Sequence, residues 1–323
     1  MKRAGIGLWM YRNQGGDGIE ARLKKELEAH DIFVVNDFDL RRCYSENGKI
    51  ITENGFDLTC VKLLYHMNAD EQTPYQIHIL EALANTGIRL VNSWQAFSAA
   101  SDKFIANLLM RNAGVRVPPS AIFSGQTSKE VVKKTISTWK SAIVKPRFSY
   151  GGKGILKFDN VSSLIDFIQA TKDFYVDFYI EKYIPFTERD YRVEIVGGEY
   201  VGSYSRGLLH SFKTNMSAAE KSSDGVFLKN LPDQKQIELA TASAHAVGLD
   251  ATIVDMVKSL EDDEFYVLET NCMLGVFVQA ANALIGIRPA DPTAYDYASD
   301  DIKLKKLAQF LIHLHRNNTN DRT

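Results

Sequence analysis

Residues 252–271 read TIVDMVKSLEDDEFYVLETN, and this stretch decides the fold of the second half of the chain. Two runs of apolar, β-branched and aromatic residues, 252–257 and 265–271, flank the polar turn 261–264. Runs of this kind on either side of a short polar turn are typical of a β-hairpin. The sequence therefore predicts two antiparallel strands here.

This hairpin would bring three oxygen-bearing side chains together. Pairing about the turn places Asp255 roughly opposite Glu269. Because side chains alternate along a strand, Asn271 shares the face of Glu269. Two carboxylates and an amide oxygen are ligands that suit Mg²⁺, which takes its remaining ligands from water and substrate phosphates. From these residues alone, a solvated hairpin face with its carboxylates directed at water is an equally good interpretation.

The rest of the chain surrounds the hairpin with two kinds of pattern. Strand and helix patterns alternate in the first ninety or so residues, at 5–10, 19–30, 32–35, 58–64, 74–85 and 88–91. Strands predominate after residue 142, at 142–145, 155–158, 178–183, 191–196, 200–205, 252–257 and 265–271, with helices at 161–171, 234–247 and 302–315. The predicted fold is an α/β N-terminal domain followed by an α+β region of two lobes.

A helix is predicted between these two regions. Ser101 or Asp102 would be its N-cap, and Gly114 lies just past its end. The residues of its predicted apolar face are Phe104, Ile105, Leu108 and Leu109.

Composition excludes several classes of partner. The chain of 323 residues has 38 Lys and Arg against 40 Asp and Glu, a formal charge of −2, which favours neither nucleic acid nor an anionic membrane surface. No stretch approaches the roughly 20 apolar residues of a membrane span. The three cysteines, Cys43, Cys60 and Cys272, have neither zinc spacing nor an even count, and a reducing cytoplasm fits them best.

A lysine and a glycine-rich turn form a second candidate site. The stretch IVKP at 143–146 is followed by FSYGGKG at 148–154. Lys145 at the end of an apolar strand places a compact charge beside the sheet, and the glycines let backbone N–H groups approach phosphate oxygens. The segment matches neither a P-loop nor a dinucleotide-binding motif. In isolation, a glycine turn with a surface lysine is the favoured interpretation.

The stretch YIEKYIPF at 179–186 is an apolar strand that breaks at a proline. Such a strand end can present backbone groups to a purine edge while Ile184 and Phe186 enclose the ring. Without further context, a core strand and loop is the better interpretation.

Two arginines, Arg192 and Arg206, lie on adjacent strands of a predicted hairpin around Gly197-Gly198. Each could pair with a carboxylate or a phosphate, or form a surface salt bridge that contributes little.

The order of these motifs resembles the ATP-grasp superfamily, and most of all its RimK-like and glutathione-synthetase-like amino acid ligases. The resemblance is detailed from about residue 100 to 285 and general before that. The matching positions are Asp102-Lys103, Val144-Lys145-Pro146, Gly151-Gly152-Lys153-Gly154, Glu181-Lys182-Tyr183-Ile184, Asp190-Tyr191-Arg192, Asp255 and Glu269-Thr270-Asn271.

The resemblance implies an N-terminal domain at 1–98 and ATP-grasp lobes at 99–186 and 187–318 that enclose ATP. It implies phosphate contacts from Lys103, Lys145 and the glycine segment, adenine and ribose contacts from the 181–190 region, and a magnesium site on the hairpin. The implied nucleotide contacts are Lys103, Lys145, Ser149, Gly151, Gly152, Gly154, Glu181, Lys182, Ile184, Asp190, Lys213 and Asn215. The implied Mg²⁺ ligands are Asp255, Glu269 and Asn271, and the implied catalytic residues are Arg206 and Arg192.

Two departures from the family pattern bear on the acceptor site. The triplet Lys213-Thr214-Asn215 is followed by MSAAEKSS where relatives have a glycine-rich stretch. Glu269-Thr270-Asn271 is followed by Cys272-Met273-Leu274-Gly275 where relatives commonly have a small residue, a proline and a glycine. For Cys272, buried and inert packing is favoured over catalysis.

The implied activity is ATP-dependent joining of a carboxylate to an amine through an acyl-phosphate. The carboxylate would belong to a small molecule or a peptide, with no nucleic acid or membrane partner, and a homo-oligomer is left open. An ATP-grasp small-molecule kinase and a non-catalytic ATP-binding scaffold are the alternatives.

Overall fold

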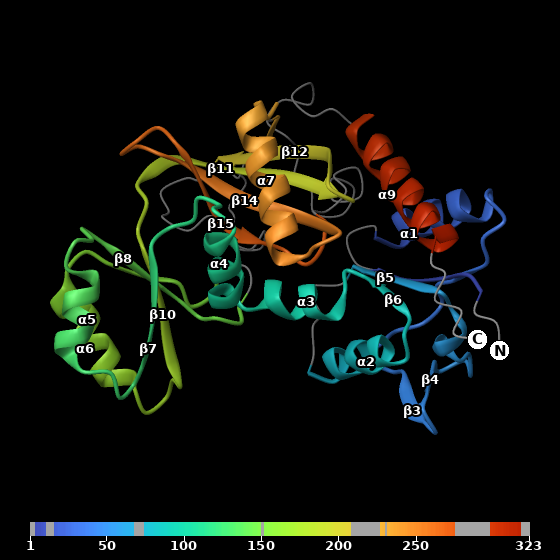
Figure 1. Ribbon diagram of the computed structural model, residues 1–323, viewed down its shortest axis with the longest axis horizontal. Helices are drawn as coiled ribbons and strands as arrows, with labels where there is room; N and C mark the ends of the chain where they lie inside the picture. Colours follow the sequence, from blue (N-terminus) through green and yellow to red (C-terminus); the bar gives the residue numbers. More distant parts are fainter. Residues whose placement is uncertain are drawn as a thin grey trace.

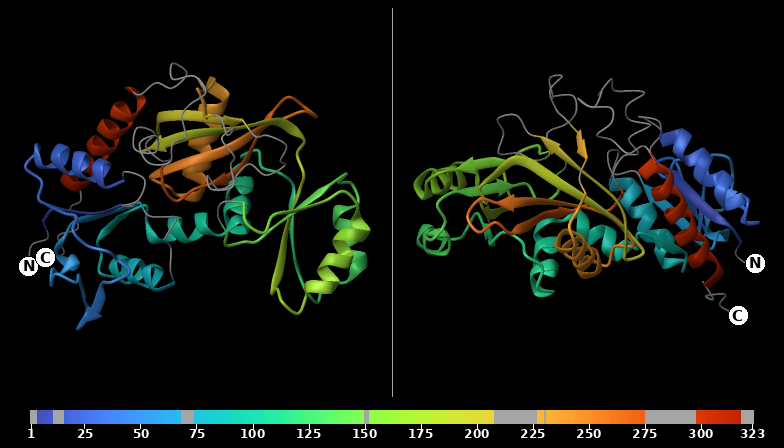
Figure 2. Two further views of the ribbon diagram at one scale, coloured as in Figure 1. Left: turned by 180° about the vertical axis from the view of Figure 1, so that it is seen from behind. Right: turned by 90° about the horizontal axis from the view of Figure 1, so that it is seen from above.

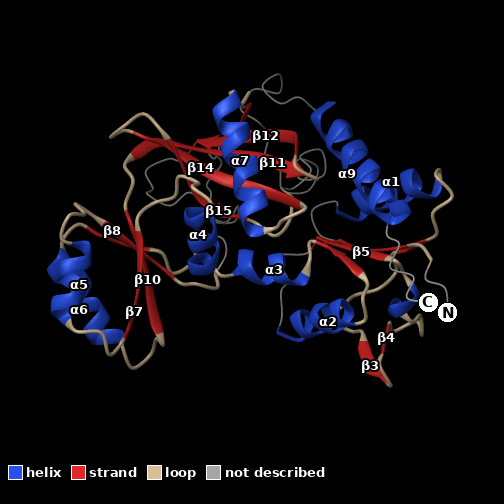
Figure 3. Cartoon of the chain, viewed as in Figure 1, coloured by secondary structure: helices blue, strands red, loops and turns tan. Residues whose placement is uncertain are grey.

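The structure is a computed structural model that describes residues 4–10, 16–67, 74–149, 152–207, 227–229, 231–274 and 298–317. Three main sheets follow one another along the chain, and helices cover them (Figures 1 and 3). The first is parallel and the other two are antiparallel. This α/β part followed by two α+β parts is the predicted fold class.

The N-terminal sheet has the strand order β2-β1-β5-β6 and is parallel throughout. Its strands are β1 (Ile6–Met10), β2 (Val34–Val35), β5 (Leu63–Met67) and β6 (Arg89–Val91). Every residue of β1 and β5 is buried, as expected for parallel strands covered on both faces. Helices α1 (Gly16–Glu28) and α9 (Ala298–Asn317) pack against one face and against each other, and α2 (Pro74–Asn85) packs against the other (Figures 1 and 2).

Part of this region was predicted wrongly. The expected strand over 58–64 begins as a 3-10 helix, η1 (Leu58–Cys60), because the Asp57 carboxylate accepts from the N–H of Thr59 and caps a turn. The small hairpin of β3 (Tyr44–Glu46) and β4 (Lys49–Ile51), which precedes it, was not predicted. Three-residue strands carry too few side chains for a periodic pattern.

The central sheet has the order β7-β10-β8-β9. Its strands are β7 (Ser120–Ser124), β8 (Ala142–Lys145), β9 (Leu156–Phe158) and β10 (Asp177–Lys182). Helices α5 (Lys129–Ile136) and α6 (Val161–Thr171) lie together beside it (Figure 1). The sheet and these helices share a hydrophobic cluster of their own, which includes Phe123, Ile136, Leu164 and Ile180.

The C-terminal sheet has the order β13-β12-β11-β14-β15. Its strands are β11 (Phe186–Val196), β12 (Glu199–Gly207), β13 (Phe227–Lys229), β14 (Ala251–Ser259) and β15 (Phe265–Thr270). The predicted turn Gly197-Gly198 joins β11 to β12, and both glycines have positive φ, as a tight hairpin turn of this kind requires. Helix α7 (Gln234–Val247) covers this sheet.

Helices α3 (Trp94–Ser101) and α4 (Lys103–Asn112) connect the N-terminal sheet to the rest. Asp102 is the N-cap of α4, one of the two predicted positions, and accepts from two backbone N–H groups. The predicted apolar face of α4 is wrong, because its buried residues are Ala106, Asn107 and Met110, whereas Leu108 is 40% exposed. The helix packs against α3, α7 and β15, so tertiary neighbours choose the buried face.

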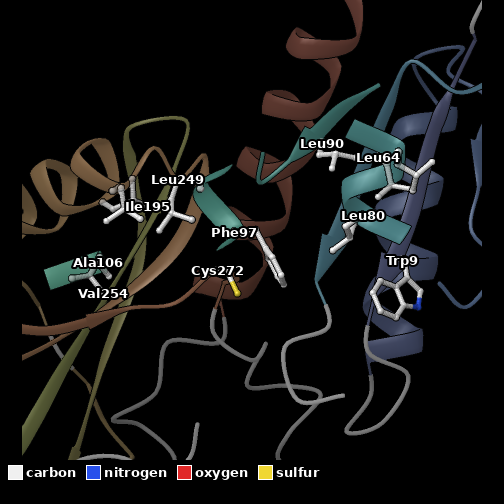
Figure 4. Close-up of a cluster of buried hydrophobic side chains, with 14 of the residues drawn as sticks. Trp9, Leu64, Leu80, Leu90, Phe97, Ala106, Ile195, Leu249, Val254 and Cys272 are labelled. Atoms are coloured by element: carbon white, nitrogen blue, oxygen red, sulfur yellow. The ribbon is translucent and has the colours of Figure 1, made fainter. Parts of the chain in front are cut away.

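One continuous core joins the N-terminal and C-terminal sheets. Figure 4 shows Trp9, Leu64 and Leu80 on one side and Ile195 and Val254 on the other, within one cluster. Asn92 links the same two parts, because its side chain exchanges 2.8 Å hydrogen bonds with the backbone of Ala251 and donates to the carbonyl of Cys272. No helix in the described parts of the chain is both long enough and apolar enough to cross a membrane.

Candidate active site

An open pocket lies between the central and C-terminal sheets, with a volume of about 560 Å³ when the solvent at its mouth is included. Its residues come from α4, from β8 and β10 of the central sheet, from the connection into β11, and from β14 and β15. The lining residues are Lys103, Pro118, Ile143, Lys145, Ile155, Glu181, Lys182, Tyr183, Ile184, Phe186, Val257, Leu268 and Glu269.

Two adjacent antiparallel strands set the first ion pair in the pocket. Glu181 on β10 pairs in register with Ile143, two residues before Lys145 on β8. The Lys145 ammonium lies 2.6 Å from the Glu181 carboxylate, and both side chains are nearly buried. The hydroxyl of Tyr179 donates to the same carboxylate at 2.7 Å. Burial, and then the charge of Glu181, raise the pKa of Tyr179, so its hydroxyl keeps the proton that it donates.

The end of β10 and the residues that follow it line an apolar slot within the pocket. The N–H groups of Lys182 and Tyr183 donate to the carbonyls of Pro119 and Ser141 at 2.7 and 3.0 Å, which fixes the backbone at this edge. The apolar walls are Ile143, Ile155, Ile184, Phe186, Val257 and Leu268. A planar ring enclosed by such walls would bury most of its surface.

The acidic hairpin has the register predicted from its sequence, because Asp255 on β14 lies opposite Glu269 on β15. The register shifts between Asp255 and Met256, since Met256 pairs with Val267 and leaves Leu268 unpaired as a bulge residue. The bulge lets Leu268 and Glu269, although adjacent in sequence, both line the pocket.

Asn271 lies beside Asp255, as the alternation of side chains predicted. Its amide nitrogen is 3.5 Å from Asp255 Oδ1 and donates to the carbonyl of Ile253 at 3.1 Å. The two carboxylates and this amide form an oxygen-rich group that fits Mg²⁺, with carbonyl and carboxylate donors and no thiolate or imidazole. Within the described residues, no group of three or more His, Cys, Asp or Glu side chains offers an alternative metal site.

Each acidic residue of the site faces a cation from another element. Lys103 at the start of α4 lies 3.7 Å from Glu269, and Arg192 on β11 lies 2.5 Å from Asp255. Asp255 is fully buried. Burial lowers the pKa of Arg192, but the charges of Asp255, Tyr204 and Asp190 together with the hydrogen bond to Tyr204 outweigh it and hold the pKa above its ordinary value. Arg192 therefore stays charged and neutralises Asp255.

The burial of Asp255 means that its replacement by alanine would affect folding as well as any metal site. With Asp255 removed, the buried guanidinium of Arg192 would lose its counter-charge, and such losses destabilise proteins by about 3–5 kcal/mol.

The structure brings most of the predicted residues to this region. Six of them line the pocket, namely Lys103, Lys145, Glu181, Lys182, Ile184 and Glu269. Asp255, Asn271 and Arg192 lie together on the hairpin and its neighbouring strand, and Asp190 is buried on β11 opposite the pocket residue Val257. Their individual roles stay predictions.

The remaining predicted residues are placed in part. The Lys103 ammonium donates to the Ser149 carbonyl, and Gly152 and Gly154 adopt positive φ. The backbone of Arg206 pairs with Asp190 across β11 and β12. Gly151, Lys213 and Asn215 lie outside the described residues.

Sequence reasoning missed several pocket residues. Ile143 could have been found, because it lies two residues before Lys145 on the same strand and therefore shares its face. Leu268 could not, because only the bulge directs it inward. Arg147 does not line the pocket, but it pairs with Asp102 at the start of α4 and was also missed.

Comparisons with known proteins place this chain in a family. The family model of the RimK-like ATP-grasp domain matches residues 100–288. The tetrahydromethanopterin:alpha-L-glutamate ligase of Methanosarcina acetivorans is 27% identical over 205 residues, which is 59% of this chain and 60% of that protein. The match therefore spans about three fifths of the relative's length.

Two solved structures share the fold over nearly the whole chain. The ATP-grasp ligase PsnB, complexed with a phosphomimetic variant of its minimal precursor, Mg and ADP, has a TM-score of 0.61 at 16% identity and covers 97% of this chain and 99% of its own. A RimK domain ATP-grasp protein from Sphaerobacter thermophilus has a TM-score of 0.62 at 14% identity, with 95% and 99% covered.

Proposed function

This chain belongs to the RimK-like ATP-grasp family, and from that premise we propose that it is an ATP-dependent carboxylate–amine ligase. The reaction would form an amide through an acyl-phosphate and release ADP and phosphate. One observation carries the proposal. Two lysines, Lys103 and Lys145, and the carboxylate of Glu269 line a pocket whose other walls are largely apolar.

That combination suits a nucleoside triphosphate. The apolar slot between Ile143, Ile184 and Leu268 would receive the base, and the polar end would receive the phosphates. Lys103 and Lys145 each face a carboxylate, at 3.7 and 2.6 Å. Bound phosphates would take over as partners of both ammonium groups.

Asp255, Glu269 and Asn271 would hold Mg²⁺, because the two acidic residues lie opposite each other on the hairpin and the Asn271 amide lies beside Asp255. When bound, the ion would neutralise charge on the phosphates. Arg192 would orient the Asp255 carboxylate through its 2.5 Å contact.

The chemistry needs positioning and positive charge and no protein nucleophile. A substrate carboxylate oxygen attacks the γ-phosphorus, the bond from that phosphorus to the bridging oxygen of ADP breaks, and ADP leaves. The amine then attacks the acyl carbon, inorganic phosphate leaves, and the amine nitrogen loses a proton. Lys103 and Lys145 would stabilise the negative charge that moves between these oxygens.

The relative described above is named an alpha-L-glutamate ligase, so L-glutamate is the first amine to test. The purified chain would be incubated with Mg²⁺, ATP, L-glutamate and pools of small and peptide carboxylates, with ADP release as the readout and product mass as confirmation. A carboxylate labelled with ¹⁸O should transfer one labelled oxygen to inorganic phosphate. Phosphate that stays attached to the product would instead indicate a kinase.

Two variants of the same hairpin sharpen the test. Glu269→Gln should reduce turnover by about a thousandfold, since a lost metal ligand removes several kcal/mol of transition-state stabilisation. Glu264→Gln, in the turn of that hairpin and outside the pocket lining, is the matched control and should retain activity. Absence of ATP binding by the wild-type chain with Mg²⁺ supplied would contradict the proposal.

A further inference from the structure

Arg147 joins three elements at the phosphate end of the pocket. Its guanidinium forms a two-pronged contact with Asp102, the N-cap of α4, in which Nε donates to Oδ1 at 3.1 Å and Nη2 donates to Oδ2. Nη1 donates at 2.6 Å to Asp177, the first residue of β10. One side chain therefore fastens the start of a helix to the central sheet.

The same connection continues through the backbone to Lys103. The N–H of Lys103 donates to the carbonyl of Arg147 at 3.2 Å, and the Lys103 ammonium donates to the carbonyl of Ser149. Residues 102 and 103 are thus bonded to residues 147 and 149 through both side chains and backbone. Lys103 is the residue of α4 that lines the pocket.

Aromatic rings enclose the guanidinium. Arg147 lies 5.9 Å from the ring centre of Phe104 and 5.1 Å from that of Phe148. Phe104 in turn contacts Tyr179, the residue that donates to Glu181. The side chain is only 24% exposed, and its hydrogen bonds to Asp102 and then to Asp177 hold its pKa above the ordinary value of arginine.

An ordinary surface ion pair would involve one flexible carboxylate and contribute little. Arg147 differs because its planar fork occupies two carboxylates on separate elements, and one of these is the cap that starts α4. Loss of the fork would leave the first turn of α4, and hence Lys103, free to shift relative to the central sheet. Small displacements of a charged group weaken contacts to a bound substrate.

We propose that Arg147 is a positioning residue for the nucleotide phosphates, which acts by holding Lys103 at the polar end of the pocket. The inference rests on the proposed ATP-dependent activity. It predicts that the effect of changing Arg147 depends on how many phosphates the ligand carries, because Lys103 would contact the phosphates and not the base.

Binding of AMP, ADP and ATP, each with Mg²⁺, would be measured by titration calorimetry for the wild type, Arg147→Ala and Arg147→Lys. We expect Arg147→Ala to weaken ATP binding by about tenfold or more, ADP less, and AMP by less than about twofold, in line with the loss of charge-assisted contacts. Arg147→Lys keeps the charge without the fork and should recover only part of the loss. In turnover, KM for ATP should rise more than kcat falls.

Arg116→Ala is the matched control. Arg116 also combines an ion pair, to Asp262 at 3.5 Å, with a ring contact, to Tyr266 at 5.5 Å, but these partners lie in the acidic hairpin and not at the start of α4. It should leave all three affinities unchanged. If Arg147→Ala does not fold, Asp177→Asn removes only the contact between Arg147 and Asp177. It should weaken binding of ATP most, ADP less and AMP least, with smaller losses of affinity than Arg147→Ala.

The outcomes separate the two proposals. Equal weakening of AMP, ADP and ATP would indicate a purely structural role and overturn the inference, as would unchanged ATP binding by Arg147→Ala in a chain whose wild type binds ATP. Failure of the wild type to bind ATP would overturn both the inference and the proposed function.

Discussion

The two antiparallel sheets that flank the pocket are supported in different ways. The central sheet packs with α5 and α6 in a cluster of its own, whereas the C-terminal sheet shares two clusters with the N-terminal sheet, α7 and α9. Lys145 belongs to the central sheet, and Asp255 and Glu269 belong to the C-terminal sheet. The charged residues of the pocket therefore come from two parts: the central sheet, which has a separate core, and the main body, meaning the N-terminal and C-terminal sheets with their shared core.

Two lysine–glutamate pairs make this comparison testable. Lys303 on α9 lies 2.5 Å from Glu194 on β11, with both side chains at least 95% buried, and Lys145 lies 2.6 Å from Glu181 at the pocket. Lys303→Met should lower the free energy of unfolding by about 3–5 kcal/mol, because it removes the ammonium group that faces the buried Glu194 carboxylate. Urea denaturation would measure the loss. ATP affinity of the folded variant should not change, and a variant as stable as wild type would break the comparison.

Acid should destabilise the main body before the central sheet. His66 is buried on β5, donates from Nε2 to the carbonyl of Asn92 at 3.0 Å, and packs edge-on against Phe97. Burial lowers the pKa of His66 to about 4, although the bond to Asn92 opposes this. When the pH falls below 6.5, the ordinary pKa of histidine, His66 takes up a proton in the unfolded chain but stays neutral in the folded chain. Stability from this group is therefore complete above about pH 6.5 and falls by about 3 kcal/mol as the pH drops to 4.

Unfolding measured between pH 4 and 7 checks this, with tryptophan fluorescence and circular dichroism as probes. His66→Phe should have a flatter pH dependence over that range. An equally steep dependence in His66→Phe would assign the acid sensitivity to other groups.

Lys145→Met tests the pocket side of the comparison. The methionine keeps the apolar stem and removes the charge, so ATP should bind about tenfold to a hundredfold more weakly, as is usual for a lost hydrogen bond to a charged group. Because the Tyr179 hydroxyl still donates to the Glu181 carboxylate at 2.7 Å, the loss of stability should be smaller than for Lys303→Met. Calorimetric titration would measure ATP affinity and urea denaturation would measure stability for the two variants side by side. A larger loss of stability in Lys145→Met than in Lys303→Met would contradict the comparison.

The smallest expected effect concerns a direct link between the two sheets. Lys182, the last residue of β10, lies 2.7 Å from Glu261 in the acidic hairpin, and both side chains are partly exposed. A double-mutant cycle with Lys182→Ala and Glu261→Ala should give a coupling of about 0.5 kcal/mol, which salt should reduce further. A coupling that is several times larger would mean that the sheets are held together more firmly than their separate cores suggest.

Much of the fold follows from local patterns in the sequence. The fold class is confirmed, and so are the opposition of Asp255 and Glu269 and the capping of α4 by Asp102, because each depends on residues close in sequence. The buried face of α4 and the start of β5 were wrong, since distant neighbours and a capped turn determine them. The proposed domain boundaries stay a prediction.

The candidate site was predictable where charge marks it. Lys103, Lys145, Glu181 and Glu269 stand out as charged residues at strand or helix ends, and the structure brings them to one pocket. The apolar walls were harder to identify, because an isoleucine in a pocket looks like an isoleucine in a core. The bulge that directs Leu268 inward leaves no signal in the sequence.

Helix α9 has a consequence for how the chain is made. Its Leu304, Leu307 and Leu311 belong to the same hydrophobic cluster as Ile6 and Leu23. The first strand therefore packs against a helix that is synthesised almost three hundred residues later. The N-terminal part emerges from the ribosome long before that helix is synthesised, and the face of its sheet that α9 covers stays exposed during that time. Contacts between such distant positions also slow folding. The apolar face of the N-terminal sheet is therefore covered only after the C-terminal helix has been made and has emerged.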